Sequence, residues 1–273
     1  MGALYKIRFL LLRRFVQIGT LALFALGNYA GLKVLQGNLS SSRLLDTVPL
    51  SDPFAALQLL FAGGVIVADY LIGALIVLAV YAAIGGRAFC AFVCPINMIT
   101  DFAAFLRRKL GIDLSVQRLV CPRKTRYAAL VIALALSALL GVGAFEMISP
   151  IGLVARSVIF GAGVGIAAAI AVFLFDLFAL KNGFCGHLCP LGGFYALVGR
   201  FGVLRVKFAQ NRCTHCLACK QICPEKQVLN VIDSDADSAV SSGECTRCGR
   251  CIEACEGGAL GFGIFAINKK DKR

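Results

Sequence analysis

Eight cysteines near the C-terminus stand in two runs with the same spacing. The first run is Cys213-x-x-Cys216-x-x-Cys219-x-x-x-Cys223-Pro224, and the second is Cys245-x-x-Cys248-x-x-Cys251-x-x-x-Cys255-Glu256. Thiolates are the ligands of iron–sulfur clusters, and this spacing is typical of [4Fe–4S] sites. Three thiolates at three-residue steps let one loop wrap a cubane, while the fourth cysteine lies beyond that loop. The two runs therefore predict two [4Fe–4S] clusters.

The fourth cysteine of each run is expected to bind the cluster of the other run, because paired sites with this spacing exchange that ligand. One cluster would then be held by Cys213, Cys216, Cys219 and Cys255, and the second by Cys245, Cys248, Cys251 and Cys223. Structural zinc and a disulfide framework are the alternatives. Zinc usually takes its four ligands as two separated pairs. Disulfides need an oxidising compartment, which the topology inferred below argues against.

The composition of the whole chain indicates a polytopic membrane protein. Of its 273 residues, 59% are hydrophobic and 16% are charged, and the mean hydropathy is +0.80. The net charge of +13 does not indicate a nucleic-acid partner, because the basic residues gather at the ends of apolar stretches, where they set orientation and meet anionic lipid. The chain has 2 histidines and no Cys-x-x-Cys-His, which excludes a multi-haem protein.

Four apolar stretches are long enough to cross a hydrocarbon core of about 30 Å. They run over residues 15–35, 65–84, 127–145 and 158–180. The basic start before the first stretch is also typical of a signal peptide, but Asn28-Tyr29-Ala30 is a poor cleavage site, so we expect a retained span.

A short helix is expected between the first two spans. Residues 36–50 are polar and rich in turn formers, and Ser51-Asp52-Pro53 then reads as an N-cap followed by proline at the first helical position. The helix should run over residues 54–62, where Gly63-Gly64 ends it. We expect it to lie in the membrane interface or to re-enter the membrane shallowly.

The distribution of Lys and Arg predicts the orientation in a bacterial inner membrane. Residues 1–14 and 85–127 hold twelve of them, whereas the connections on the opposite side hold three. The positive-inside bias therefore places both termini and the 85–127 connection in the cytoplasm. We expect a four-helix α-helical membrane domain over residues 1–200 and a cytoplasmic α+β ferredoxin-like domain with two clusters over residues 201–273.

A second pair of cysteine motifs belongs to an internal repeat in the membrane domain. The motif Phe-Cys-x-x-x-Cys-Pro occurs twice, 95 residues apart, at Cys90 and Cys94 and at Cys185 and Cys189. The halves, about residues 1–110 and 111–200, enter and leave on the same sides, so the repeat has parallel topology. Four convergent thiolates could hold a further iron–sulfur or redox centre. The alternative is that these small side chains only pack the ends of the spans.

The combination of four spans, two Cys-x-x-x-Cys-Pro elements and a C-terminal double-cluster domain resembles the NapH family. Members are ferredoxin-type membrane components of the quinol dehydrogenase that feeds periplasmic nitrate reductase. The resemblance covers essentially the whole chain and carries over all twelve motif cysteines. One departure is Glu256, because proline commonly follows the last cysteine in the family; this loosens a turn without removing a ligand.

The resemblance implies a role in nitrate respiration. The chain would be the electron-transfer subunit of a quinol dehydrogenase, a redox subunit rather than a complete enzyme, and would pass electrons from the membrane quinone pool through its clusters. Its partners would be a NapG-type periplasmic iron–sulfur protein and, further on, a c-type cytochrome. The alternative is an iron–sulfur redox sensor or an assembly factor for a membrane or periplasmic oxidoreductase.

Two polar residues are candidates for the proton transfer that quinol oxidation needs. His187 lies between Cys185 and Cys189, and Asp176 lies near the end of the last span. Ionisable residues within membrane segments are functional candidates by default. The sequence assigns neither residue a definite role.

Overall fold

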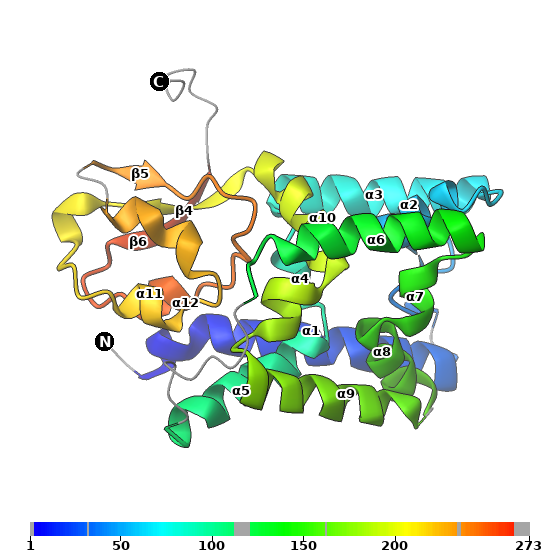
Figure 1. Ribbon diagram of the computed structural model, residues 1–273, viewed down its shortest axis with the longest axis horizontal. Helices are drawn as coiled ribbons and strands as arrows, with labels where there is room; N and C mark the ends of the chain where they lie inside the picture. Colours follow the sequence, from blue (N-terminus) through cyan, green and yellow to red (C-terminus); the bar gives the residue numbers. More distant parts are fainter. Residues whose placement is uncertain (1–2, 32, 112–120, 162, 234–235, 265–273) are drawn as a thin grey trace. The chain divides into compact units, whose positions relative to one another are not determined.

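The computed structural model describes residues 3–31, 33–111, 121–161, 163–233 and 236–264. Part of the basic 85–127 connection, residues 112–120, and the predicted cytoplasmic C-terminus, residues 265–273, lie outside these ranges. The described chain is mostly helical (Figure 1). It forms two compact units. We call residues 1–13, 80–91 and 195–273 the cysteine unit, and residues 14–79 and 92–194 the helical unit.

The first half of the chain contains a long helix, a small sheet and several helices. Its elements are α1 (Ala3–Tyr29), β1 (Leu35–Gly37), β2 (Ser41–Leu44), β3 (Val48–Ser51), α2 (Pro53–Phe61), α3 (Ala68–Ile84), α4 (Ala88–Phe92), α5 (Ile96–Lys109) and α6 (Thr125–Leu140). The second half continues with α7 (Ala144–Ile148), α8 (Pro150–Phe160), α9 (Val164–Leu174), the π-helical turns η1 (Phe175–Ala179) and η2 (Phe184–Leu188), and α10 (Pro190–Val198). The remaining elements are η3 (Gly199–Phe201), β4 (Leu204–Phe208), η4 (Gln210–Arg212), α11 (Ala218–Ile222), η5 (Lys226–Asp233), β5 (Ser238–Ala239), α12 (Arg250–Glu253) and β6 (Leu260–Ile264).

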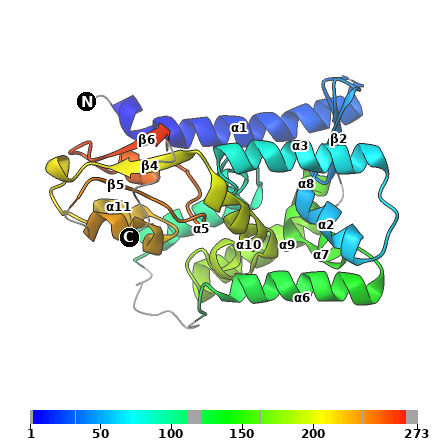
Figure 2. The same ribbon diagram turned by 90° about the horizontal axis from the view of Figure 1, so that it is seen from above.

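One described helix is long and apolar enough to cross a membrane: residues Ile7–Tyr29 of α1 (Figure 2). The other three predicted spans correspond to shorter apolar helices, Ala68–Ile84, Thr125–Leu140 and Val164–Ala179. Glycines in the left-handed conformation end two of the apolar helices. Gly141 ends α6, and Gly161 ends α8 and separates it from α9. The prediction that one span runs unbroken from residue 158 was therefore wrong, since residues 158–160 belong to α8.

The helical unit confirms the predicted short helix and adds a sheet that the sequence did not predict. Asp52 caps α2, since its carboxylate accepts hydrogen bonds from the backbone N–H groups of Phe54 and Ala55, and Pro53 is the first helical residue. In the preceding polar segment, β1, β2 and β3 form an antiparallel sheet in that order. α2 packs against α6, α8 against α9, and α5 against α9.

The cysteine unit is built on a second antiparallel sheet, with β4 between β5 and β6 (Figure 1). Leu204 of β4 pairs with Ile264, and Phe208 with Leu260. Val206 and Phe208 are buried on the same face, as the two-residue repeat of a strand requires. That face forms one core with the buried side chains of Leu229, Ile252 and three of the motif cysteines, Cys219, Cys223 and Cys251. The core therefore lies directly beside the cysteine runs and holds their loops in place.

Candidate iron–sulfur centres

The two cysteine runs share an unusual backbone conformation at equivalent positions. The residue before the second cysteine of each run, His215 or Arg247, has a φ of 53°. The residue after that cysteine, Leu217 or Gly249, also has a positive φ, of 59° or 76°. Residues other than glycine seldom adopt this region, and such strain concentrates at functional sites. Both loops are therefore shaped in the same way, as expected if each wraps the same kind of group.

Two backbone N–H groups point toward cysteine sulfurs of the first site. The backbone nitrogen of His215 lies 3.4 Å from Sγ of Cys213, and that of Ala259 lies 3.2 Å from Sγ of Cys255. Successive N–H groups in such turns make a concave site for an anion. A cluster bound by four thiolates carries a net negative charge on its sulfurs, so these N–H groups would stabilise it.

The first cysteine site is a cavity of about 400 Å³ in the cysteine unit. Four cysteines line it: Cys213, Cys216, Cys219 and Cys255. Phe208, Ile232 and Leu260 contribute apolar walls. Three of the cysteines come from the first run and the fourth comes from the second run.

The second site has the converse composition. Its lining includes Cys245, Cys248 and Cys251 from the second run and Cys223 from the first. This space is much smaller, about 10 Å³, and Val206 and Leu229 close one side. The two linings divide the eight cysteines as the crossed ligand assignment does.

The electrostatics of the thiols show that they lie close together, both within each set and between the two sets. Burial raises the pKa of Cys219, and the neighbouring Cys255 and Cys216 thiols raise it further. Burial likewise raises the pKa of Cys251 well above its usual range, and Cys248, Cys245, Cys223 and Cys219 act in the same direction. Thiolates that lie close together repel one another, so the iron of a bound cluster would stabilise their deprotonated form.

The donor set fits a cubane better than a single ion. Among the described residues, no three His, Cys, Asp or Glu side chains converge closely enough to hold one metal ion. A [4Fe–4S] cluster has iron at four separate corners, so its ligands surround it rather than meet at one point. The four cysteines around each cavity would supply such ligands, and the second space, of about 10 Å³, would have to widen to admit a cluster.

A buried ion pair beside the second cavity was not predicted from the sequence. The guanidinium of Arg87 lies 2.6 Å from Oε1 of Glu225, and both side chains are only 2% exposed. The same NH1 group donates to the carbonyl oxygen of Glu244 at 2.9 Å. In the sequence, Arg87 is only one of the basic residues of the 85–127 connection that indicate the orientation of the chain. The Gly-Gly that precedes it is the one local signal, since glycine permits close backbone approach.

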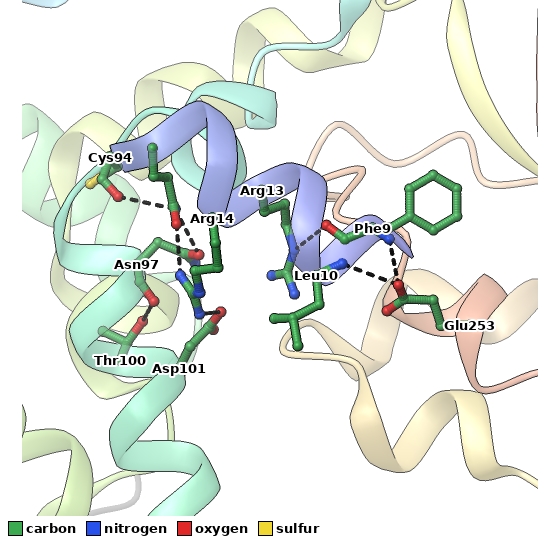
Figure 3. Close-up of polar contacts among 10 residues, drawn as sticks. Phe9, Leu10, Arg13, Arg14, Cys94, Asn97, Thr100, Asp101 and Glu253 are labelled. Atoms are coloured by element: carbon green, nitrogen blue, oxygen red, sulfur yellow. Dashed lines mark hydrogen bonds and ion pairs between the residues drawn. The ribbon is translucent and has the colours of Figure 1, made fainter. Parts of the chain in front are cut away.

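The N-terminal end of α1 is held to the second cysteine run within the cysteine unit. The carboxylate of Glu253, on α12, accepts hydrogen bonds from the backbone nitrogens of Phe9 and Leu10 at 2.6 and 3.1 Å (Figure 3). The ring of Phe9 meets that of Phe262 edge to face, with centroids 5.4 Å apart. A side chain at Gly249 would collide with Phe9, which explains glycine at that position.

The Cys-x-x-x-Cys-Pro elements end in two different helical forms. Cys90 lies on α4 and Cys94 just after it, whereas Cys185 lies on the π-helical turn η2, which ends at Cys189. Cys94 and Cys189 are both 4% exposed. Gln17 donates a hydrogen bond to the carbonyl oxygen of Cys94 (Figure 3). Cys90 belongs to the cysteine unit and the other three to the helical unit, so a site shared by all four stays a prediction.

Asp176 and His187 lie on the two successive π-helical turns. The carboxylate of Asp176 is buried and accepts a hydrogen bond from the backbone nitrogen of Phe184, the first residue of η2. Arg107 donates to the carbonyl oxygen of Asp176 at 3.1 Å. Burial lowers the pKa of His187, and the positive charge of Arg123 lowers it further. π-helical turns occur frequently at functional sites, but the described contacts do not join Asp176 and His187 directly.

Two family models match the chain. The one described as "4Fe-4S binding domain" matches residues 66–113 and 160–209, which contain the two Cys-x-x-x-Cys-Pro elements. The one described as "4Fe-4S dicluster domain" matches residues 205–256, which contain both cysteine runs. Taken with the two cavities, these matches define the chain as a ferredoxin-type iron–sulfur protein of electron transport.

Several curated proteins are similar along most of their length. The ferredoxin-type protein NapH of Escherichia coli is 42% identical over 251 residues, which cover 91% of this chain and 86% of that protein. NapH of Haemophilus influenzae is also 42% identical, over 93% of this chain and 89% of that protein. The methylamine utilization ferredoxin-type protein MauN of Methylorubrum extorquens is 43% identical, over 89% of this chain and 85% of that protein. No solved structure matches the chain. The chain belongs to the NapH family of ferredoxin-type proteins.

Proposed function

We propose that the chain is the membrane-bound electron-transfer subunit of a quinol dehydrogenase. It takes electrons from quinol and passes them through two [4Fe–4S] clusters, one held by Cys213, Cys216, Cys219 and Cys255 and the other by Cys245, Cys248, Cys251 and Cys223. The observation that carries this proposal is the division of the eight cysteines between two cavities, three from one run and one from the other in each case. Clusters of this type do one-electron chemistry, and the surrounding burial and hydrogen bonds set their potentials.

The membrane assignment rests on the apolar helices. We propose that residues 1–200 cross the inner membrane four times, with both termini in the cytoplasm, and that residues 201–273 form the cytoplasmic ferredoxin-like domain. Large apolar side chains on these helices face outward, including Phe15 on α1 and Leu139 on α6, at 78% and 81% exposure. Lipid would cover such side chains. The other three proposed spans, Ala68–Ile84, Thr125–Leu140 and Val164–Ala179, have about the minimum length for crossing the membrane. Local thinning of the bilayer, or the residues that flank each helix, would make up the missing length.

The Cys-x-x-x-Cys-Pro elements are proposed as a further redox or cluster site near the cytoplasmic membrane edge. A family model described as binding 4Fe-4S covers both elements, and Cys94 and Cys189 are buried in equivalent places in the repeat. Quinol gives up two electrons and two protons. We propose that such a site accepts the electrons first and passes them to the two clusters of the C-terminal domain. Asp176 and His187 are the candidate proton acceptors.

The electron acceptor is proposed by similarity to named relatives. Two relatives are named ferredoxin-type protein NapH. Because the resemblance to that family implies a periplasmic nitrate reductase system, we propose a NapG-type iron–sulfur protein and a c-type cytochrome as the next carriers. The MauN relative, whose name places it in methylamine utilization, is equally similar. A second candidate is therefore the same electron-transfer chemistry in a methylamine system, and co-purification with the native partner proteins distinguishes the two.

The proposal is tested on the full chain, purified in detergent with its clusters and supplied with a reduced short-chain quinol. We expect quinol to reduce both clusters, with reduced-cluster EPR signals equal to those given by dithionite. A Cys90→Ser, Cys94→Ser variant should lose the quinol-driven signal and keep the dithionite signal, because the C-terminal clusters are intact. Cys121→Ser, which alters a cysteine outside all four motifs, is the matched control.

Two results would contradict the proposal. Clusters that dithionite reduces but quinol does not, in the unmodified protein, would favour a redox sensor or an assembly factor. Undiminished quinol-driven reduction in the Cys90→Ser, Cys94→Ser variant would remove the redox role of the membrane cysteines and leave them as packing residues, since serine nearly matches cysteine in size.

A further inference from the structure

A connected set of buried polar groups surrounds the second cavity within the cysteine unit. Arg87 binds the carboxylate of Glu225 and the carbonyl oxygen of Glu244 through one nitrogen. Gln227 bridges the two acids, since its amide donates to Glu225 Oε2 and Glu244 Oε2, each at 2.7 Å. Glu225 itself lines the cavity with Cys223, Cys245, Cys248 and Cys251.

The two acidic residues of this set lie next to ligand cysteines in the sequence. Glu225 follows Cys223 by two residues, and Glu244 immediately precedes Cys245. Arg87 therefore joins the segment that supplies the exchanged ligand, Cys223, to the segment that begins the second run. These are the two stretches of chain that must stay together for a cluster to have all four of its ligands.

The backbone just before Arg87 approaches its neighbours too closely for a side chain at Gly85 or Gly86. A Cβ atom on Gly86 would lie 2.0 Å from the carbonyl oxygen of Tyr195, and one on Gly85, whose φ is +127°, would lie 1.9 Å from the guanidinium of Arg247. Arg247 lies inside the second run and donates to the carbonyl oxygens of Leu204 and Gly199 at 2.6 and 3.1 Å. The Gly85-Gly86-Arg87 segment is thus fixed against the loop that wraps the second site.

A charge buried at this place acts strongly on a cluster. Reduction adds one electron to the cluster, so a nearby carboxylate opposes reduction and a nearby cation favours it. Water screens exposed charges, but side chains that are 2% exposed are screened much less. Without Arg87, the carboxylate of Glu225 would lose this buried cationic partner and place more negative charge at the wall of the second cavity.

We propose that Arg87 is a positioning residue that sets the reduction potential of the cluster held by Cys223, Cys245, Cys248 and Cys251, by neutralising Glu225 and fixing the Cys223 segment. The inference rests on the proposed two-cluster function and deepens it. It assigns a role to a residue that precedes the first Cys-x-x-x-Cys-Pro element by three positions and lies 138 residues from its partner. No proton or bond changes in this step; the cluster gains one electron.

The test is an EPR-monitored redox titration of the full chain at one pH. Glu225→Gln removes the negative charge and leaves the guanidinium of Arg87, which stays protonated in proteins. We expect the midpoint potential of the Cys223-containing cluster to rise in this variant. In the double variant Arg87→Gln, Glu225→Gln both charges are absent, so the potential should return toward that of the unmodified protein.

The other cluster and an exposed ion pair provide controls. The cluster held by Cys213, Cys216, Cys219 and Cys255 should shift less. Asp233→Asn removes a carboxylate of the same unit that is 61% exposed and pairs with Lys220; both potentials should stay unchanged because solvent screens that charge. If Glu225→Gln does not accumulate as folded protein, Arg87→Lys with Glu225→Gln carries the same extra charge on a smaller head group, and the same rise is expected.

A Glu225→Gln potential equal to that of the unmodified protein would overturn the inference. So would equal shifts of both clusters, or a double variant that shifts as far as the single one, because either would indicate a general structural effect. Absence of two cluster signals in the unmodified protein would instead refute the proposed function, so the two failures are distinguishable.

Discussion

At the residue scale, the crossed sharing of ligands makes a prediction about one cysteine. Cys223 belongs by sequence to the first run but lines the cavity of the second. Cys223→Ala should therefore disturb the cluster held by Cys245, Cys248 and Cys251 and remove roughly half of the cluster iron, because a [4Fe–4S] cluster needs four ligands. Iron analysis and EPR measure this loss. Cys121→Ala should keep both clusters, and loss confined to the Cys213, Cys216 and Cys219 cluster would refute the crossing.

Residue spacing indicates some features of the cysteine sites and gives no sign of others. The ligand sets stay a prediction, which rests on the three-residue steps that let one loop present three thiols and on the exchange of the fourth ligand between paired sites. The pairing of Arg87 with Glu225 could not be predicted, because a single arginine among many basic residues carries no signal for a partner 138 positions away. The left-handed conformations of Leu217 and Arg247 could not be predicted either, since their side chains do not favour that region.

At the element scale, α2 depends on its N-cap. The carboxylate of Asp52 satisfies two backbone N–H groups that have no partner inside the helix. Asp52→Ala should lower the free energy of unfolding by about 1 kcal/mol. Thermal unfolding of the helical unit in detergent, followed by circular dichroism in the full chain, measures the change. Asp52→Asn is the matched control, because its amide oxygen can still cap the helix; an equal loss in both variants would argue against capping as the cause.

Helices were predicted more reliably than their ends. The Asp-Pro start of α2 follows from local chemistry, and it was confirmed. The ends of the apolar helices depend on which glycines turn left-handed, and Gly141 and Gly161 do so within stretches that hydropathy alone treats as continuous. The small β1–β3 sheet also escaped prediction, because its strands have three or four residues and lack a clear alternation of apolar and polar side chains.

At the scale of the whole molecule, the proposed topology predicts where reporters will work. A reporter that is active only outside the cytoplasm should be active when fused after Ser42, and inactive after Arg108 or Arg273. The reason is the excess of Lys and Arg in the segments assigned to the cytoplasm. Fusions to a reporter active only in the cytoplasm should give the opposite pattern. Extracytoplasmic activity at Arg273 would overturn the placement of the clusters.

The division of the chain also has a consequence for biosynthesis. The cysteine unit consists of three segments, residues 1–13, 80–91 and 195–273, with more than one hundred residues of the helical unit between the last two. At about 5–20 residues per second, the ribosome needs roughly 5–20 s to make that stretch. The Gly85-Gly86-Arg87 segment is therefore synthesised well before Glu225, whose carboxylate pairs with Arg87. Iron and sulfide delivered before Cys251 is synthesised would meet an incomplete second cavity, so insertion of that cluster must follow synthesis of the second run.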